Sequence, residues 1–192
     1  VLMARSVEFG RRYNVPIIVK STFTNNKGTV VKEKTMEEAI VSGVTHNDKE
    51  VKFTLFGVPD QPGIAGTVFG SLSEIGTNVD MIVQNVSKES ITDISFTAPS
   101  EQQKDVEDAL KNISKQLDAK GYDVDENIAR ISIIGAGMKS ESGVASKMFK
   151  TLGDNKINIS MISTSPIRVS CVISSNDIEK ALNVLHEEFI TN

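Results

Sequence analysis

The stretch FGVPDQPGIAGTVFGSLSEIGTNVDMIVQN, residues 56–85, joins two apolar segments through a polar turn and a helix-forming segment. The periodicity predicts a strand over residues 51–58, a helix over residues 63–75 and a second strand over residues 78–84. The turn between the first strand and the helix carries none of the nucleophiles or acid–base pairs that catalysis usually requires. We therefore expect this turn to bind a ligand rather than to react with one.

The same stretch occurs twice in the chain. A shift of 80 positions superimposes identical residues throughout turn, helix and second strand. Examples are Gly63 and Gly143, Ala65 and Ala145, Phe69 and Phe149, Leu72 and Leu152, Asn78 and Asn158, and Met81 and Met161. Because the spacing holds without a gap, the pattern indicates a duplicated module.

Each copy predicts the same order of elements. After the second strand, the first copy continues with a strand at residues 92–97, a helix at 101–117 and a short strand at 122–125. The resulting order, βαββαβ, is typical of a ferredoxin-like α+β fold, in which two helices cover one face of an antiparallel sheet. The uncovered face favours an oligomer or a face-to-face pair of modules.

The second copy lacks a fourth strand of its own. Its predicted strands lie at residues 129–136, 158–163 and 167–173, and its helices at 143–154 and 177–189. A surplus apolar segment precedes the first copy, within EEAIVSGVTHND at residues 37–48. We expect this segment to complete the second sheet.

The composition excludes several classes of function. The 192 residues carry a net charge of -4, with 21 basic residues dispersed among 25 acidic ones, so neither nucleic acid nor an anionic membrane is expected as a partner. One cysteine cannot form an internal disulfide, and no apolar run reaches the roughly 20 residues of a membrane span. The first residues lack a signal-peptide core. We expect a cytoplasmic location.

The helix-opening turn suits the two poles of an α-amino acid. A helix that begins at Gly63 presents the amides of Gly63, Ile64 and Ala65 and the positive end of its dipole, which favour a carboxylate. Asp60 and neighbouring carbonyls can accept an ammonium group. The turn is therefore a candidate amino-acid site.

Two longer stretches carry a resemblance to a known family. VPDQPGIAGTVFGSLSEIGTNVDMIVQNVS and IIGAGMKSESGVASKMFKTLGDNKINISMISTSPIRVSCVI resemble the paired ACT modules at the C-terminal end of aspartokinase. Residues 4–31 resemble the last helix and strand of that family's catalytic domain. The resemblance implies a kinase remnant at residues 1–35, a strand that completes the second module at 36–47, a first ACT module at 48–127 and a second at 128–192.

The resemblance also implies amino-acid effector sites where a first module faces a second one. One site is expected to use Asp60, Gly63, Ile64, Ala65 and Gln84 with Asn158 and Ile159. A possible second, pseudo-symmetric site is expected to use Ser140, Gly143, Val144 and Ala145 with Asn78, Val79 and Asp80. The two sets differ in chemistry, since Asp60 becomes Ser140 and a lysine stands at position 156.

Catalytic, cofactor and metal sites are not expected. The sequence IIGAGMKSESG imitates a dinucleotide fingerprint, but its glycine spacing is too long. His46 and His186 stand apart in polar contexts with no third ligand suitably spaced, and Cys171 alternates with core positions on a strand. No phosphate-binding loop or metal-binding carboxylate cluster of a kinase is present in the sequence.

The function favoured by the resemblance is allosteric regulation of an aspartokinase by threonine, lysine or both, as feedback inhibition of aspartate phosphorylation. The expected partners are a second copy of the chain and a catalytic subunit or domain. Two alternatives stay open: the chain is part of a full-length aspartokinase whose catalytic domain lies outside it, or a freestanding amino-acid sensor.

Overall fold

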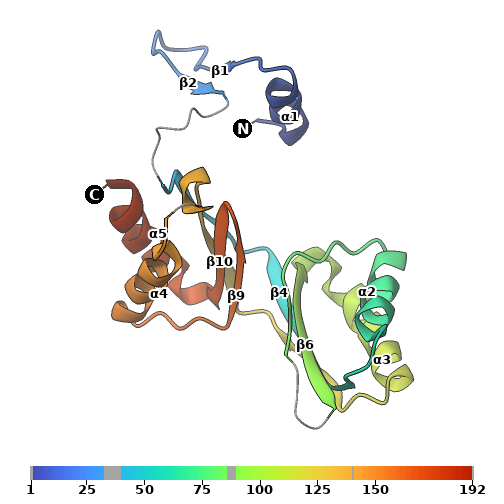
Figure 1. Cartoon of the computed structure of the whole chain (residues 1–192). Coiled ribbons are helices and arrows are strands. Elements are labelled where there is room, and N and C mark those ends of the chain that lie inside the picture. The colour runs from blue at the N-terminus through green and yellow to red at the C-terminus, as the bar shows by residue number, and fades with distance from the viewer. Residues whose placement is uncertain (1, 33–39, 86–89, 140, 192) are drawn as a thin grey trace. The chain divides into compact units, whose positions relative to one another are not determined.

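The computed structural model describes residues 2–32, 40–85, 90–139 and 141–191, and the chain divides into two compact units, Val1–Ala39 and Ile40–Asn192 (Figure 1). The boundary lies close to residue 36, where the resemblance implied the start of the second module's extra strand. Residues 33–39, which include the first part of that segment, lie outside the described residues.

The smaller unit contains helix α1 (Ala4–Arg12) and an antiparallel pair of strands, β1 (Ile17–Val19) and β2 (Thr29–Val31). Gly28 has a φ of 75°, and a Cβ there would lie 2.2 Å from the carbonyl oxygen of Val19, so only glycine fits this turn. Helix α1 has no buried residue. Large apolar side chains are exposed on this unit, among them Phe9, Tyr13, Ile18, Phe23 and Val30.

The larger unit contains the two modules that the sequence repeat predicted. The first module comprises β4 (Glu50–Pro59), α2 (Ile64–Glu74), β5 (Ile82–Gln84), β6 (Ile91–Pro99), the 3-10 turn η1 (Ser100–Gln102), α3 (Gln103–Gln116) and β7 (Gly121–Asp125). Its strands form an antiparallel sheet in the order β5-β6-β4-β7. Helices α2 and α3 cover the same face of this sheet (Figure 1).

Alternation along the strands places the core of the first module between sheet and helices. Val51, Phe53 and Leu55 of β4 are buried on the helix-covered face. Val68 and Leu72 of α2 pack against them, as do Val106, Leu110 and Ile113 of α3. The spacing of these residues is the one that the sequence showed, so packing follows directly from the periodicity.

The second module repeats this arrangement with a strand taken from elsewhere in the chain. Its elements are β8 (Ile128–Ile134), η2 (Ala136–Lys139), α4 (Val144–Asp154), β9 (Met161–Ser165), β10 (Arg168–Ser174), η3 (Ser175–Asp177), α5 (Ile178–His186) and a final π turn, η4 (Glu187–Thr191). Strand β3 (Gly43–Asn47) pairs antiparallel with β8, so the sheet order is β3-β8-β10-β9. The surplus segment before the first module thus supplies the fourth strand.

The second strand of each module is displaced from its predicted start. The sequence pattern indicated strands from residues 78 and 158, whereas β5 begins at Ile82 and β9 at Met161. After α2, the amide of Thr77 still bonds back to the carbonyl of Leu72, and the first bond to the neighbouring strand is made by Asp80. The residues between Thr77 and Asp80 follow the end of the helix and, among the described residues, make no backbone hydrogen bonds to the neighbouring strand. Strand propensity alone does not predict this delay.

Candidate functional site

The two helix-opening turns share an unusual backbone conformation. Gly63 has φ 94° and ψ -15°, and Gly143 has φ 96° and ψ -9°. A Cβ at either glycine would meet nothing within 4 Å, so crowding does not explain the residue. The left-handed conformation does, because residues with a side chain rarely adopt it. A residue with a side chain would therefore be strained at either position.

Of the three backbone amides that the sequence predicted as carboxylate donors in the first turn, two have no acceptor among the described residues. The amide of Ile64 donates to the carbonyl of Gln61 at 3.3 Å. The amides of Gly63 and Ala65 have no acceptor among the described residues. They sit at the first turn of an 11-residue helix, where the dipole favours an anion.

The second turn has the same construction. Helix α4 also has 11 residues, and the amides of Gly143, Val144 and Ala145 find no acceptor within the part of the chain that the structure describes. Ser140, the second site's counterpart of Asp60, lies outside the described residues. The two turns therefore offer comparable anion-binding ends.

Asp60 and Gln84 flank the first turn. Asp60 is half-buried, and its amide donates to the carbonyl of Ser90 at 2.9 Å, which fixes the backbone at this point. Gln84 ends β5 and is exposed. Both side chains are available to a ligand.

The other half of each candidate site is a short extended segment with free backbone groups. Val79 and Ile159 are half-buried and pack against the cores of their modules, whereas Asn78 and Asn158 are exposed. Among the described residues, no backbone hydrogen bond involves any of these four residues. A ligand with a peptide-like backbone can pair with such a segment as an added strand would.

The described chain does not join the two halves of either candidate site. No hydrogen bond links the turn at residues 60–65 to Asn158 or Ile159, and none links the turn at residues 143–145 to Asn78 or Val79, among the residues with described positions. Closure of each site by a facing module stays a prediction.

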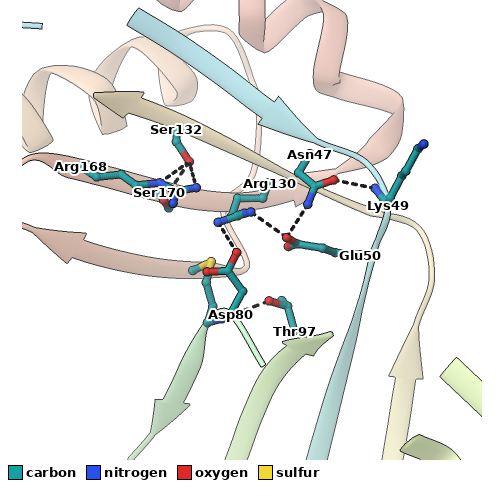
Figure 2. A network of polar contacts seen from close by, with 10 residues as sticks. Asn47, Lys49, Glu50, Asp80, Thr97, Arg130, Ser132, Arg168 and Ser170 are labelled. Atoms are coloured by element: carbon teal, nitrogen blue, oxygen red, sulfur yellow. Dashed lines mark hydrogen bonds and ion pairs between the residues drawn. The ribbon is translucent and has the colours of Figure 1, made fainter. Parts of the chain in front are cut away.

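An ion-pair network at the junction of the modules was not anticipated from the sequence (Figure 2). The guanidinium of Arg130, on β8, lies 2.8 Å from Oε1 of Glu50 and 2.6 Å from Oδ2 of Asp80. Asn47 donates its side-chain amide to the same oxygen of Glu50 at 2.7 Å. The network thus connects both modules through Arg130.

Burial makes this network different from an ordinary surface ion pair. The side chains of Arg130 and Glu50 are 9% and 5% exposed, whereas that of Asp80 is 43% exposed. Burial raises the pKa of Glu50; Arg130 opposes that shift and Asp80 adds to it. Oε2 of Glu50 and Nε of Arg130 have no hydrogen-bond partner among the described residues. Each of these two buried charges consequently needs the other to offset its loss of hydration.

A signal for this network was present in the repeat. The 80-residue shift superimposes Arg130 on Glu50, so equivalent positions carry opposite charges. Next to the pair, the equivalent residues Met81 and Met161 belong to one buried apolar cluster. Equivalent positions of the two copies therefore meet at the junction, and a search for charge reversal between the copies would have found the pair.

A cavity of about 360 Å³ lies beside the network. Its lining includes Glu50, Asn78, Asp80, Lys49 and Glu101. Two of these residues, Asn78 and Asp80, belong to the second candidate site. The cavity therefore extends that site toward the junction.

The other titratable residues with described positions show no catalytic arrangement. His46 and His186 are exposed on different elements, and burial raises the pKa of the Cys171 thiol to about 12, as in an unreactive core cysteine. Among the described residues, no group of histidine, cysteine or carboxylate side chains could hold a metal ion. None of the described helices has the length and apolar character needed to cross a membrane.

Comparison with protein families identifies both modules. An ACT domain model matches residues 52–118 and another matches residues 131–189. These matches confirm the expected pair of ferredoxin-like α+β modules.

Curated relatives are longer than this chain. An aspartate kinase of Pseudomonas fluorescens is 44% identical over 192 residues, which cover 98% of this chain and 46% of that protein. The chain thus spans about half the length of the curated relatives that it matches.

Solved structures include chains that this one covers almost completely. The regulatory subunit of aspartate kinase from Thermus thermophilus, in its ligand-free form, is 35% identical with a TM-score of 0.74; the match covers 78% of this chain and 99% of that one. A structure of aspartokinase alpha and beta subunits contains a chain that is 38% identical with a TM-score of 0.73, at 78% and 98% coverage.

Proposed function

The chain belongs to the aspartokinase family as a regulatory region built from two ACT domains, and we propose that it binds threonine, lysine or both. Binding would lower the rate at which an aspartokinase catalytic part phosphorylates aspartate with ATP. The chain itself supplies regulation and not catalysis. In the cell this would constitute feedback inhibition in the cytoplasm by end products of the route that aspartate phosphorylation begins.

The observation that carries this proposal is the repeated helix opening at Gly63 and Gly143. Each opening combines a left-handed glycine with unpaired amides at the positive end of a helix dipole. This arrangement suits the carboxylate of an amino acid. The extended segments at Asn78 and Asn158 provide free backbone groups for the rest of its main chain.

In this proposal the first effector site comprises Asp60, Gly63, Ile64, Ala65 and Gln84 with Asn158 and Ile159 of the facing module. The second comprises Ser140, Gly143, Val144 and Ala145 with Asn78, Val79 and Asp80. In the helix-opening turn of the first site, the amides of Gly63 and Ala65 have no acceptor among the described residues, whereas the amide of Ile64 donates to Gln61. The halves would be brought together in a homodimer, where a first module faces the partner's second module.

A catalytic partner is the second part of the proposal. One similar structure is that of aspartokinase alpha and beta subunits, and the curated relatives are about twice as long as this chain. Residues 2–32 expose many apolar side chains and contain no buried helix face, which fits a segment that packs on a catalytic body. The partner is either a separate subunit or the remainder of the same polypeptide.

Calorimetry and light scattering on the 192-residue chain test this function. Threonine or lysine should bind and raise the melting temperature, because a ligand that binds only the folded state adds RT ln(1 + [L]/Kd), about 2.7 kcal/mol at a hundredfold excess over Kd. Light scattering should return a dimer at micromolar concentration. The chain alone should form no ADP from ATP and aspartate. Lack of binding by both amino acids, or a strict monomer in their presence, would contradict the proposal.

A further inference from the structure

Asp80 occupies a distinct position in the second effector site. Its amide donates to the carbonyl of Thr97 at 3.1 Å, and the next amide, that of Met81, donates to the hydroxyl of Thr97 at 3.2 Å. The backbone is thus fixed, while the Asp80 side chain is 43% exposed and lines the cavity beside the junction. A carboxylate in this position is accessible to the side chain of an effector.

The Asp80 carboxylate already has a cationic partner. Nη1 of Arg130 lies 2.6 Å from Oδ2 of Asp80 (Figure 2). Arg130 is itself held by Glu50 at 2.8 Å, and Glu50 is held by Asn47. Because Glu50 is 5% exposed, a movement of Arg130 away from the network would leave a buried carboxylate without a counter-ion. Arg130 is therefore a fixed charge.

The first effector site has no such arrangement. The residue equivalent to Asp80 is Ser160, whose hydroxyl donates to the carbonyl of Val172 at 3.2 Å. The residue equivalent to Arg130 is Glu50. The main-chain contact is nevertheless the same, since the amide of Ser160 also donates to a neighbouring strand, to Val172 at 2.8 Å. The two sites thus share a backbone and differ in charge.

We propose that Arg130 is a positioning residue that sets the specificity of the second effector site by holding the Asp80 carboxylate. This inference rests on the proposed function, because it concerns the choice among amino acids at that site. With Asp80 paired to Arg130, the site offers an ammonium group a carboxylate whose charge is already balanced. It therefore favours an effector with a neutral side chain, such as threonine, over one with a cationic side chain, such as lysine.

Competition for one carboxylate gives this preference its physical basis. The cavity of about 360 Å³ has room for an amino-acid side chain and carries the carboxylates of Glu50, Asp80 and Glu101. A lysine ammonium would be attracted there, but Arg130 weakens that attraction at Asp80, and an exclusive ion pair with Asp80 requires the displacement of Arg130. That displacement separates Arg130 from an acceptor at 2.6 Å and weakens the link between the modules. A neutral side chain requires no such exchange.

The test replaces the buried pair with neutral residues of similar size. In Glu50→Gln/Arg130→Gln, Asp80 loses its partner without an uncompensated charge being left in the interior. Affinities for lysine and threonine at the second site are measured by NMR, from the amide shifts of Asn78, Val79 and Asp80. We expect the lysine affinity to rise about fivefold relative to that of threonine, the upper range for one partly exposed ion pair. Adding Asp80→Asn should remove the gain.

Two controls separate specificity from general structural change. Asp108→Asn/Lys111→Gln removes an exposed ion pair of α3 and should leave the ratio of lysine to threonine affinity unchanged. The amides of Asn158, Ile159 and Ser160 report the first site in every variant and should keep their parent response.

The outcomes distinguish failure of this inference from failure of the proposed function. If the parent amides at both sites respond to neither amino acid, the proposed function is wrong. If they respond to either but the ratio at the second site is unchanged in Glu50→Gln/Arg130→Gln, Arg130 does not set specificity. A gain that persists after Asp80→Asn would likewise overturn the role of Asp80.

Discussion

The two ACT modules have nearly the same backbone and different chemistry at equivalent positions. Helices α2 and α4 each have 11 residues and open with a left-handed glycine. Positions 76 and 156 both have positive φ, although one is glycine and the other lysine. The equivalent Thr77 and Ile157 are both buried. The shared fold therefore depends on backbone conformation and burial, and the side chains at equivalent positions can differ.

At the junction of the two modules, residues at equivalent positions contact each other. Met81 and Met161 are equivalent and belong to one apolar cluster, where identical residues can share a dry contact. Glu50 and Arg130 are also equivalent and also meet, but identical charges there would repel one another. The reversal of sign between the copies makes the contact attractive.

The largest change in stability is expected when one of the two opposite charges, Glu50 and Arg130, is removed alone. Arg130→Met leaves Glu50 buried without a counter-ion and should lower the free energy of unfolding by about 3–5 kcal/mol. Urea unfolding measures the change. Glu50→Met/Arg130→Met, in which neither charge is present, should lie within about 1 kcal/mol of the parent. A single variant as stable as this double variant would show that the pair is not coupled.

A smaller effect should separate the two helix openings. Gly63→Asp and Gly143→Asp introduce the same residue at nearly the same φ, so their backbone penalties are matched. The added carboxylate repels that of an effector at the altered turn only. At a hundredfold excess of threonine over Kd, Gly63→Asp should lose the stabilisation of about 2.7 kcal/mol that is due to the first site, as measured by thermal unfolding. Gly143→Asp should retain it. An equal threonine response in the parent and Gly63→Asp would exclude the first turn as the site.

Thr77 and Ile157, which are buried at equivalent positions of the two modules, provide a stability test of the comparison between the modules. Oγ1 of Thr77 has no hydrogen-bond partner among the described residues, whereas Ile157 presents no polar atom. Thr77→Val keeps the shape and removes the unpaired hydroxyl, so it should raise the free energy of unfolding by about 1 kcal/mol. Ile157→Val, the matched change in the other module, should lower it by about 1 kcal/mol. Destabilisation by both changes would indicate that the Thr77 hydroxyl is satisfied in solution.

The smallest effect concerns the pH dependence of the junction. Burial raises the pKa of Glu50 above its ordinary value of 4.5, and Arg130 partly opposes this shift. A carboxyl group with a raised pKa in the folded state contributes stability that is fully present below the unfolded pKa and is lost as pH rises through the folded pKa. The stability of the parent relative to Glu50→Gln should therefore fall as pH increases from about 4 toward neutrality. Urea titrations at several pH values measure this difference, and a difference that grows with pH would contradict the raised pKa.

Much of the fold could be predicted because it follows from local periodicity. The apolar spacing of residues 101–117 gives α3, and the alternation of Val51, Phe53 and Leu55 gives the buried face of β4. The first residues of β5 and β9 could not be predicted. They depend on where the chain, after each helix, first makes a hydrogen bond to the neighbouring strand. The turn residues of the candidate sites were recognised from glycine and helix chemistry, but their φ angles were not.

The repeat, the α+β modules, the family and the residues at the two helix openings could all be identified from the order of the amino acids. These properties depend on spacing along the chain and on the conformational freedom of glycine. The contacts of Arg130 with Asp80 and Glu50, which lie 50 and 80 positions away from it in the chain, became visible only in the folded structure. The strength of an ion pair depends on separation and burial, and both are fixed only when the two modules pack against each other.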